Sequence, residues 1–89
     1  MTNEELLVEC KKGLGIPLAV TATDSAIRQK LLAVKSYIIG AGVSETILTD
    51  DLAVGCIVIG VTDLWNLNPG EIKFSPAFRA LLTQLVYRS

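Results

Sequence analysis

The stretch that decides the fold is LAVGCIVIGVTDLW, residues 52–65. Eleven of its residues run without a charge before Asp63, and Trp65 is the only tryptophan in the chain. Five of the fourteen residues are valine or isoleucine, which favour strands. A strand over residues 51–66 would nevertheless be about three times the usual length, and it would lack polar alternation. The sequence therefore predicts a helix here.

This helix is expected to be buried at the centre of the fold. Its small or polar residues fall on one narrow stripe, formed by Asp51, Gly55, Val58, Thr62 and Asn66. Apart from Asp63, the other positions are apolar or glycine, and a helix that is apolar around most of its circumference is usually buried on all sides. Gly55 and Gly60 would permit a neighbouring helix to approach closely, at about 1 kcal/mol each relative to alanine.

The N-terminal segment predicts a short helix over residues 3–12. Thr2 and Glu5 match a capping box, in which the N-cap hydroxyl and the carboxylate three residues later bond each other's backbone N–H. Gly13 and Gly15 are expected to end the helix.

Two further helices are predicted from apolar residues spaced three or four positions apart. The first begins at Thr23 or Asp24, ends at the glycines of residues 40–42, and has the stripe Ile27, Leu31, Val34 and Ile38. The last begins at Ser75-Pro76, an N-cap followed by a preset first helical residue, and has the stripe Phe78, Leu81, Leu82 and Leu85.

The segment NLNPGEIKF, residues 66–74, predicts a polar loop built on a strong turn signal. Short extended segments could flank that turn. The expected fold is thus a single all-α domain over residues 1–89, a small four-helix bundle with one structured loop or short hairpin before the last helix.

The composition indicates burial against other chains. The protein is 51% hydrophobic and 19% charged, with a mean hydropathy of +0.49. A chain of 89 residues buries only about 60–65% of its unfolded surface. The longest uncharged runs have eleven residues, too few for a membrane-spanning helix of about 20. The N-terminus does not resemble a signal peptide, so we expect a cytoplasmic protein.

Residues suited to catalysis are scarce. The chain has no histidine and no phosphate-binding glycine loop. Its two cysteines, Cys10 and Cys56, are 46 positions apart and are expected to be buried thiols, with a disulfide as the minor alternative. We therefore expect neither an enzyme nor a cofactor or metal site. The carboxylates of Asp50 and Asp51 are expected to cap a helix, whereas Asp63 should reach solvent or meet a cation of another helix or subunit. Trp65 is expected to belong to the core rather than to a ligand platform.

Charge is distributed unevenly between the predicted helices. The second helix carries the bases Arg28, Lys30 and Lys35, and the third carries the acids Asp50, Asp51 and Asp63. Two solvated faces would explain this pattern. A sharper hypothesis is that the basic face of one subunit meets the acidic face of its neighbour.

Three segments, in this order and spacing, resemble a known family. They are VKSYIIGAGVSE (residues 34–45), GVTDLWN (residues 60–66) and GEIKFSPAF (residues 70–78). Together they resemble the small head–tail connector proteins (portal adaptor or head completion proteins) of long-tailed bacteriophages and prophages, in particular a version from phages of Gram-positive bacteria. The similarity extends from about Asn3 to Leu85, and none of the three segments is a catalytic signature.

The resemblance implies an α-helical virion protein without enzymatic activity. Such proteins form a closed ring of about twelve subunits beneath the portal, extend the DNA channel and present a docking surface to the tail-side connector. The implied partners are further copies of the chain, the portal protein and a tail-side protein, with DNA passing through the lumen without sequence-specific binding and no membrane. The implied location is the head–tail interface of the virion, and the host cytoplasm during assembly.

Loops on a rigid scaffold often carry binding residues, so we expect the subunit and partner contacts on the loop before the last helix and its surroundings. The candidate residues are Asp63, Trp65, Asn66, Glu71, Lys73, Phe74 and Arg79.

Two alternative functions remain. A small helical DNA-binding regulator would use the turn at residues 40–42 and the helix after it, but a recognition helix needs polar and basic side chains that LAVGCIVIGV lacks. The net charge of −1 also argues against tight DNA binding. A generic oligomerisation module outside phages is the second alternative, and the neighbouring genes would distinguish it from a connector.

Overall fold

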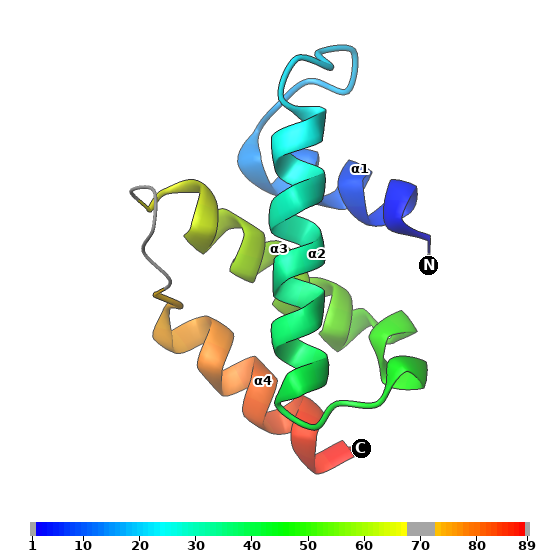
Figure 1. Cartoon of the computed structure of the whole chain (residues 1–89), viewed down its shortest axis with the longest axis vertical. Coiled ribbons are helices and arrows are strands. Elements are labelled where there is room, and N and C mark those ends of the chain that lie inside the picture. The colour runs from blue at the N-terminus through cyan, green and yellow to red at the C-terminus, as the bar shows by residue number, and fades with distance from the viewer. Residues whose placement is uncertain (1, 68–72, 89) are drawn as a thin grey trace.

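A computed structural model describes residues 2–67 and 73–88 of the chain. It contains four α-helices and one 3-10 helix: α1 (Asn3–Leu14), α2 (Asp24–Gly40), η1 (Glu45–Thr49), α3 (Asp51–Trp65) and α4 (Pro76–Arg88). These described segments contain no β-strand. The prediction of an all-α four-helix fold is confirmed (Figure 1). The centre of the predicted loop, residues 68–72, lies outside the described residues, and so does the hairpin considered there.

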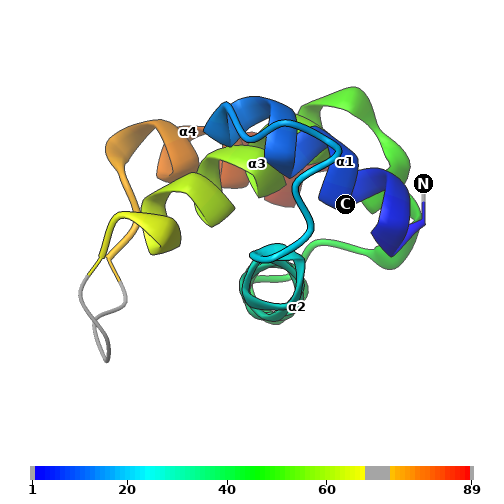
Figure 2. The same ribbon diagram turned by 90° about the horizontal axis from the view of Figure 1, so that it is seen from above.

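Helix α3 is the centre of the fold, as its sequence predicts. It contacts the three other α-helices. Viewed along α2, the helices α1, α3 and α4 form one layer, and α2 crosses a single face of that layer (Figure 2). The side chains of Ala53, Cys56, Ile57 and Val61 on α3 are fully buried.

The apolar stripes of the outer helices pack onto α3. All four stripe residues of α2 are fully buried, whereas on α4 only Phe78 and Leu85 are, and Leu81 and Leu82 are partly exposed. Helix α4 therefore retains an apolar flank that the rest of the described chain does not cover.

Helix α1 is longer than predicted, because Gly13 does not end it. The helix continues to Leu14, and Gly15 is the cap, with φ of 72°. A Cβ atom on Gly13 would lie 2.6 Å from Cγ1 of Val58. Gly13 thus provides the space in which α1 packs on α3, and only Gly15 has the left-handed conformation that ends a helix. The capping box of Thr2 and Glu5 is confirmed.

Lys11 is buried, and its role is not evident from the sequence. Its Nζ donates to the carbonyl oxygens of Leu18 (3.1 Å) and Val20, and lies 2.9 Å from Oδ1 of Asp24. Since Leu18 and Val20 belong to the connector between α1 and α2, one ammonium group holds this connector and the first residue of α2 in place.

The predicted caps of α3 and α4 are present. Oδ1 of Asp50 accepts from the backbone N–H of Leu52 at 3.0 Å, and Oγ of Ser75 accepts from the N–H of Phe78 at 3.3 Å. The bond from Leu52 is the main cause of the lowered pKa of Asp50, and Arg88 adds to it. The 3-10 helix η1, which precedes α3, was not predicted.

Candidate functional site

Four of the seven predicted contact residues line one shallow depression between the end of α3 and the start of α4. Its volume is about 270 Å³, and its described lining residues are Asp63, Asn66, Leu67, Lys73, Phe74, Ser75 and Pro76. Trp65 and Arg79 are not among them, and Glu71 lies outside the described residues. The structure therefore brings together Asp63, Asn66, Lys73 and Phe74.

Asp63 joins two helices of its own chain. Its Oδ2 accepts a hydrogen bond of 2.9 Å from the backbone N–H of Ser75, the residue that caps α4. The partners expected from the sequence were solvent or a cation of another helix or subunit. A backbone N–H is an equally good partner, because a helix start leaves several N–H groups without a bond inside the helix.

Phe74 contributes to the core as well as to the depression. Only 7% of its surface is exposed, and its ring stacks on Phe78 with 4.1 Å between the centroids and 18° between the planes. The ring of Tyr37 on α2 lies 4.8 Å from that of Phe74. This aromatic cluster holds the start of α4 against α2, so Phe74 presents only an edge to the surface.

Trp65 is half-buried against the core, as expected. Lys30 of α2 places its Nζ 5.7 Å from the centre of the indole ring, a distance at which a cation is attracted to the face of the ring. This face of Trp65 is therefore in contact with its own chain.

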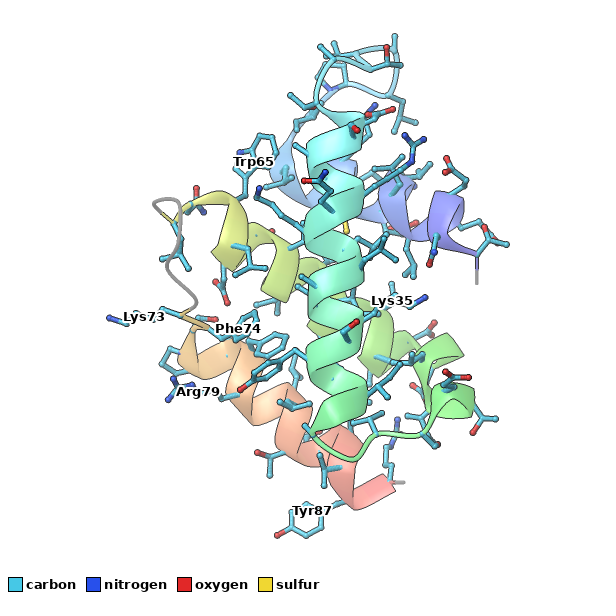
Figure 3. The ribbon with its side chains drawn as sticks, viewed as in Figure 1. Lys35, Trp65, Lys73, Phe74, Arg79 and Tyr87 are labelled. Carbon is cyan, nitrogen blue, oxygen red and sulfur yellow. The ribbon has the colours of Figure 1, made fainter. Side chains whose placement is uncertain are left out.

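Lys73 and Arg79 are the charged members of the predicted contact set that the structure describes as exposed. Both side chains are exposed, and neither forms a salt bridge with any residue that the structure describes. Figure 3 shows both of them at the same edge of the molecule, pointing outward from the start of α4. In the same view Phe74 points inward, towards α2.

Most of the charges in the predicted basic and acidic faces have partners within the chain. Arg28 makes two bonds of 3.1 Å to the carboxylate of Glu4, and Lys35 donates to Oδ1 of Asn3 at 2.7 Å. Asp50 pairs with Arg88 at 2.8 Å. Few of these charges are therefore available to a neighbouring subunit, and this weakens the hypothesis that the basic face of α2 meets the acids of α3 in the next copy.

A second surface, missed in the sequence, lies where α2 and α4 end. An apolar depression of about 340 Å³ is lined by Ala41, Leu82, Thr83, Val86 and Tyr87. Tyr87 is 86% exposed and projects beyond the end of the molecule in Figure 3. Val86 and Tyr87 are apolar residues that lie outside the apolar stripe of α4. Such positions are exposed on the helix, and this sequence pattern indicates a second apolar surface.

Exposed apolar side chains also lie at the opposite end. The connector between α1 and α2 carries Leu18 and Val20, which are 53% and 44% exposed, and it forms the top of the molecule in Figure 1. A large apolar side chain in a segment without regular structure has no helix to bury it. The sequence GIPLAV thus carried a pattern that could have identified this surface.

The two cysteines are buried and free. Burial in apolar surroundings raises the pKa of each thiol from 9.0 to about 11, and the carboxylate of Glu9 adds to the effect at Cys10. A thiol with such a pKa is almost entirely protonated at neutral pH and is a poor nucleophile.

Comparisons with known protein families, with curated proteins and with solved structures found no match. Among the helices of the described residues, none combines the length and the apolar character needed to cross a membrane. The candidate site of this α-helical scaffold thus has two parts. One is the edge with the exposed charges of Lys73 and Arg79, and the other is the pair of ends with exposed apolar side chains.

Proposed function

We propose that the protein is a head–tail connector, a structural subunit of a phage particle that forms a ring between portal and tail. The observation that carries this proposal is the position of the exposed apolar side chains. Leu18 and Val20 lie at one end of the molecule, and Val86 and Tyr87 lie at the other, while Leu32, Tyr37 and Ile39 are exposed on α2 between them. The longest extent of the molecule is 37 Å.

A subunit with a partner at each end requires such an arrangement. Exposed apolar residues that gather at particular places, rather than being scattered singly, indicate contact with other proteins. In a connector ring, one end of each subunit would contact the portal and the other end the tail-side protein. The order of the sequence motifs supports the same role.

The charge of the chain suits a channel for DNA. Its net charge is −1. A lumen rich in lysine would bind phosphates and hold the duplex, whereas a weakly acidic one lets DNA pass. We propose no enzymatic step.

The position of α3 argues against a DNA-binding regulator. In that alternative, α3 would be the recognition helix, and its side chains would have to enter a groove of DNA. Ala53, Cys56 and Ile57 are fully buried instead. A generic oligomerisation module would also expose apolar ends. The experiment that follows must therefore distinguish a connector from such a module.

Deletion of the gene from the parent phage or prophage, followed by electron microscopy of the induced particles, tests the proposal. The expected result is free tails beside DNA-filled or leaking heads without tails, and complementation with the intact gene should restore joined particles. Normal, tailed and infectious particles from the deletion strain would overturn the connector role and leave the generic module as the better account.

A further inference from the structure

We propose that copies of this chain associate head to tail, the start of α4 in one copy contacting the η1–α3 corner of the next. The inference rests on the ring proposed above and identifies its lateral contact. We use the name basic edge for Lys73, Arg79 and the depression beside them. We use the name acidic edge for Glu45, on η1, and Asp51, in the first turn of α3.

The basic edge combines a concave surface with two cations that have no salt-bridge partner among residues 2–67 and 73–88. Lys73 lines the depression, and Arg79 lies one turn into α4, at the same side of the molecule (Figure 3). Both are exposed and form no salt bridge within the described part of the chain. Leu67 and Pro76 give the depression an apolar wall.

The acidic edge has the complementary charge. Glu45 and Asp51 are exposed and form no salt bridge with the described residues, whereas Asp50 between them is paired with Arg88. The first turn of α1, with the exposed Glu5, lies on the same side of the molecule (Figures 1 and 2). Among the described residues without a salt bridge, Glu5, Glu45 and Asp51 lie on this side of the molecule together with one base, Lys35, which donates to Asn3. Lys73 and Arg79 lie on the other side together with one acid, Asp63, which accepts from the backbone N–H of Ser75. Each side thus has an excess of one sign of charge.

The two edges lie on opposite sides of the subunit. In both views η1 and the start of α3 are at the right, and the start of α4 is at the left. A contact between identical edges would bring like charges together, which is unfavourable. A contact between opposite edges is heterologous, and repetition of such a contact gives a closed ring or an open filament. The charge distribution thus favours the kind of contact from which a ring is built.

The expected strength of one contact is modest. An exposed ion pair contributes about 0–1 kcal/mol, and complementary charges act more on specificity and association rate than on affinity. An ordinary interface covers about 800 Å² on each partner. Two such lateral faces fit on a subunit with a total accessible surface of 5242 Å². Because the charges are exposed, we expect the association to weaken as salt is added.

Charge reversal tests the contact with the full chain. One variant carries Lys73→Glu and Arg79→Glu, and a second carries Glu45→Lys and Asp51→Lys. Sedimentation velocity at low ionic strength should show salt-sensitive oligomers for the unchanged protein and monomers for each variant alone. An equimolar mixture of the two variants should associate again, because each acidified edge then faces a basified one. Circular dichroism of each variant checks that the fold is intact.

A matched control is Lys12→Glu, which makes the same change of charge as Lys73→Glu on an exposed residue of α1. We expect Lys12→Glu to leave association within about twofold of the unchanged protein and Lys73→Glu to weaken it by at least about fivefold, which corresponds to about 1 kcal/mol.

Cross-linking gives an independent readout. Since Cys10 and Cys56 are buried, a variant with Ser44→Cys and Ala77→Cys presents only two reactive thiols, one beside each edge, and it retains the four charged residues of the contact. A short bis-maleimide should produce a ladder of covalent oligomers, while each single cysteine variant should give little product.

Three results would overturn the head-to-tail contact: an unchanged protein that stays monomeric at low ionic strength, variants that associate as well as the original, or efficient dimers of a single cysteine variant. If particles of the deletion strain still lack tails in that case, the connector role stands and the ring uses other contacts. Normal particles from the deletion strain, together with successful charge exchange, would support self-association and contradict the connector role.

Discussion

Lys11 shows how much one side chain can organise in a small domain. Its side chain is 3% exposed, and that of Asp24, its partner, is 16% exposed. The ammonium group exchanges water for two carbonyl oxygens and one carboxylate. A buried pair adds little net stability compared with an apolar replacement of both partners, but removal of one partner leaves the other without compensation.

We therefore predict that Lys11→Met lowers the free energy of unfolding by about 2–4 kcal/mol, because the connector carbonyls and Asp24 lose their partner. Urea denaturation followed by circular dichroism measures this change. Lys12→Met is the control, since Lys12 is exposed, and its effect should be within about 0.5 kcal/mol. An equal effect of the two variants would contradict the role assigned to Lys11.

The two thiols give a prediction about pH. Their pKa in the folded protein is raised to about 11 from 9.0, so the folded state retains protons that the unfolded state releases in this range. The stabilisation is complete below pH 9 and is lost as the pH rises towards 11. The free energy of unfolding should fall across this window, and it should fall less steeply in a variant with Cys10→Ala and Cys56→Ala. Equal slopes for the two proteins would contradict the raised pKa values.

At the scale of the helix, the glycines of α3 have different roles. A Cβ atom on Gly60 would lie 2.7 Å from Cε2 of Phe78 and 2.8 Å from Cγ1 of Val34. A Cβ atom on Gly55 would meet nothing within 4 Å. The sequence predicted close approach at both glycines, and the structure confirms it only at Gly60, where α2 and α4 both pack on α3.

This difference predicts opposite effects of the same substitution. Gly60→Ala should lower the free energy of unfolding by about 1–3 kcal/mol, because the methyl group overpacks the core. Gly55→Ala should raise it by up to about 1 kcal/mol, because alanine favours the helix and no neighbour is displaced. Thermal and urea unfolding of both variants provide the measurement, and a stabilising Gly60→Ala would show that α2 and α4 can move away from α3.

Helix positions could be predicted because each one depends on local signals. Thr2, Asp50 and Ser75 each have a side chain that bonds the backbone a few residues away, and such bonds are visible in the sequence. The partners of Lys11 and Asp63 could not be predicted. They lie on segments that the chain brings together only through folding, and a charged residue gives no indication of which backbone group it will meet.

The candidate site could be predicted only in part, because some of its residues come together only when the chain folds. The loop after α3 was expected to carry contact residues, since it follows a buried helix and contains turn residues. Lys73 and Arg79 are indeed exposed there, but Phe74 is directed into the core by Tyr37 and Phe78. The local pattern of α4 marks Val86 and Tyr87 as apolar residues outside its buried stripe, but the depression that they line also depends on Ala41 at the end of α2, which α4 meets only after folding.

At the scale of the whole molecule, substitutions of two tyrosines are expected to distinguish effects on stability from effects on function. Tyr37 is 48% exposed but packs against Phe74 and Phe78, whereas Tyr87 is 86% exposed. We predict that Tyr87→Ser changes the free energy of unfolding by less than about 0.5 kcal/mol, and that Tyr37→Ser lowers it by at least about 1 kcal/mol.

In complementation of the deletion strain, Tyr87→Ser should nevertheless reduce the yield of infectious particles, because it removes an apolar contact at one end of the subunit. The yield of infectious particles relative to the amount of folded protein in the lysate is the quantity to compare. Full complementation by Tyr87→Ser would show that this end of the subunit contacts no partner.

The central claim is that this chain forms the ring between portal and tail, and electron cryomicroscopy of intact virions from the parent phage tests it most directly. We predict a ring of helical density at the head–tail junction into which this four-helix fold fits, with the η1–α3 corner of each subunit facing the start of α4 in the next. A well-resolved junction whose every density belongs to other proteins would contradict the account.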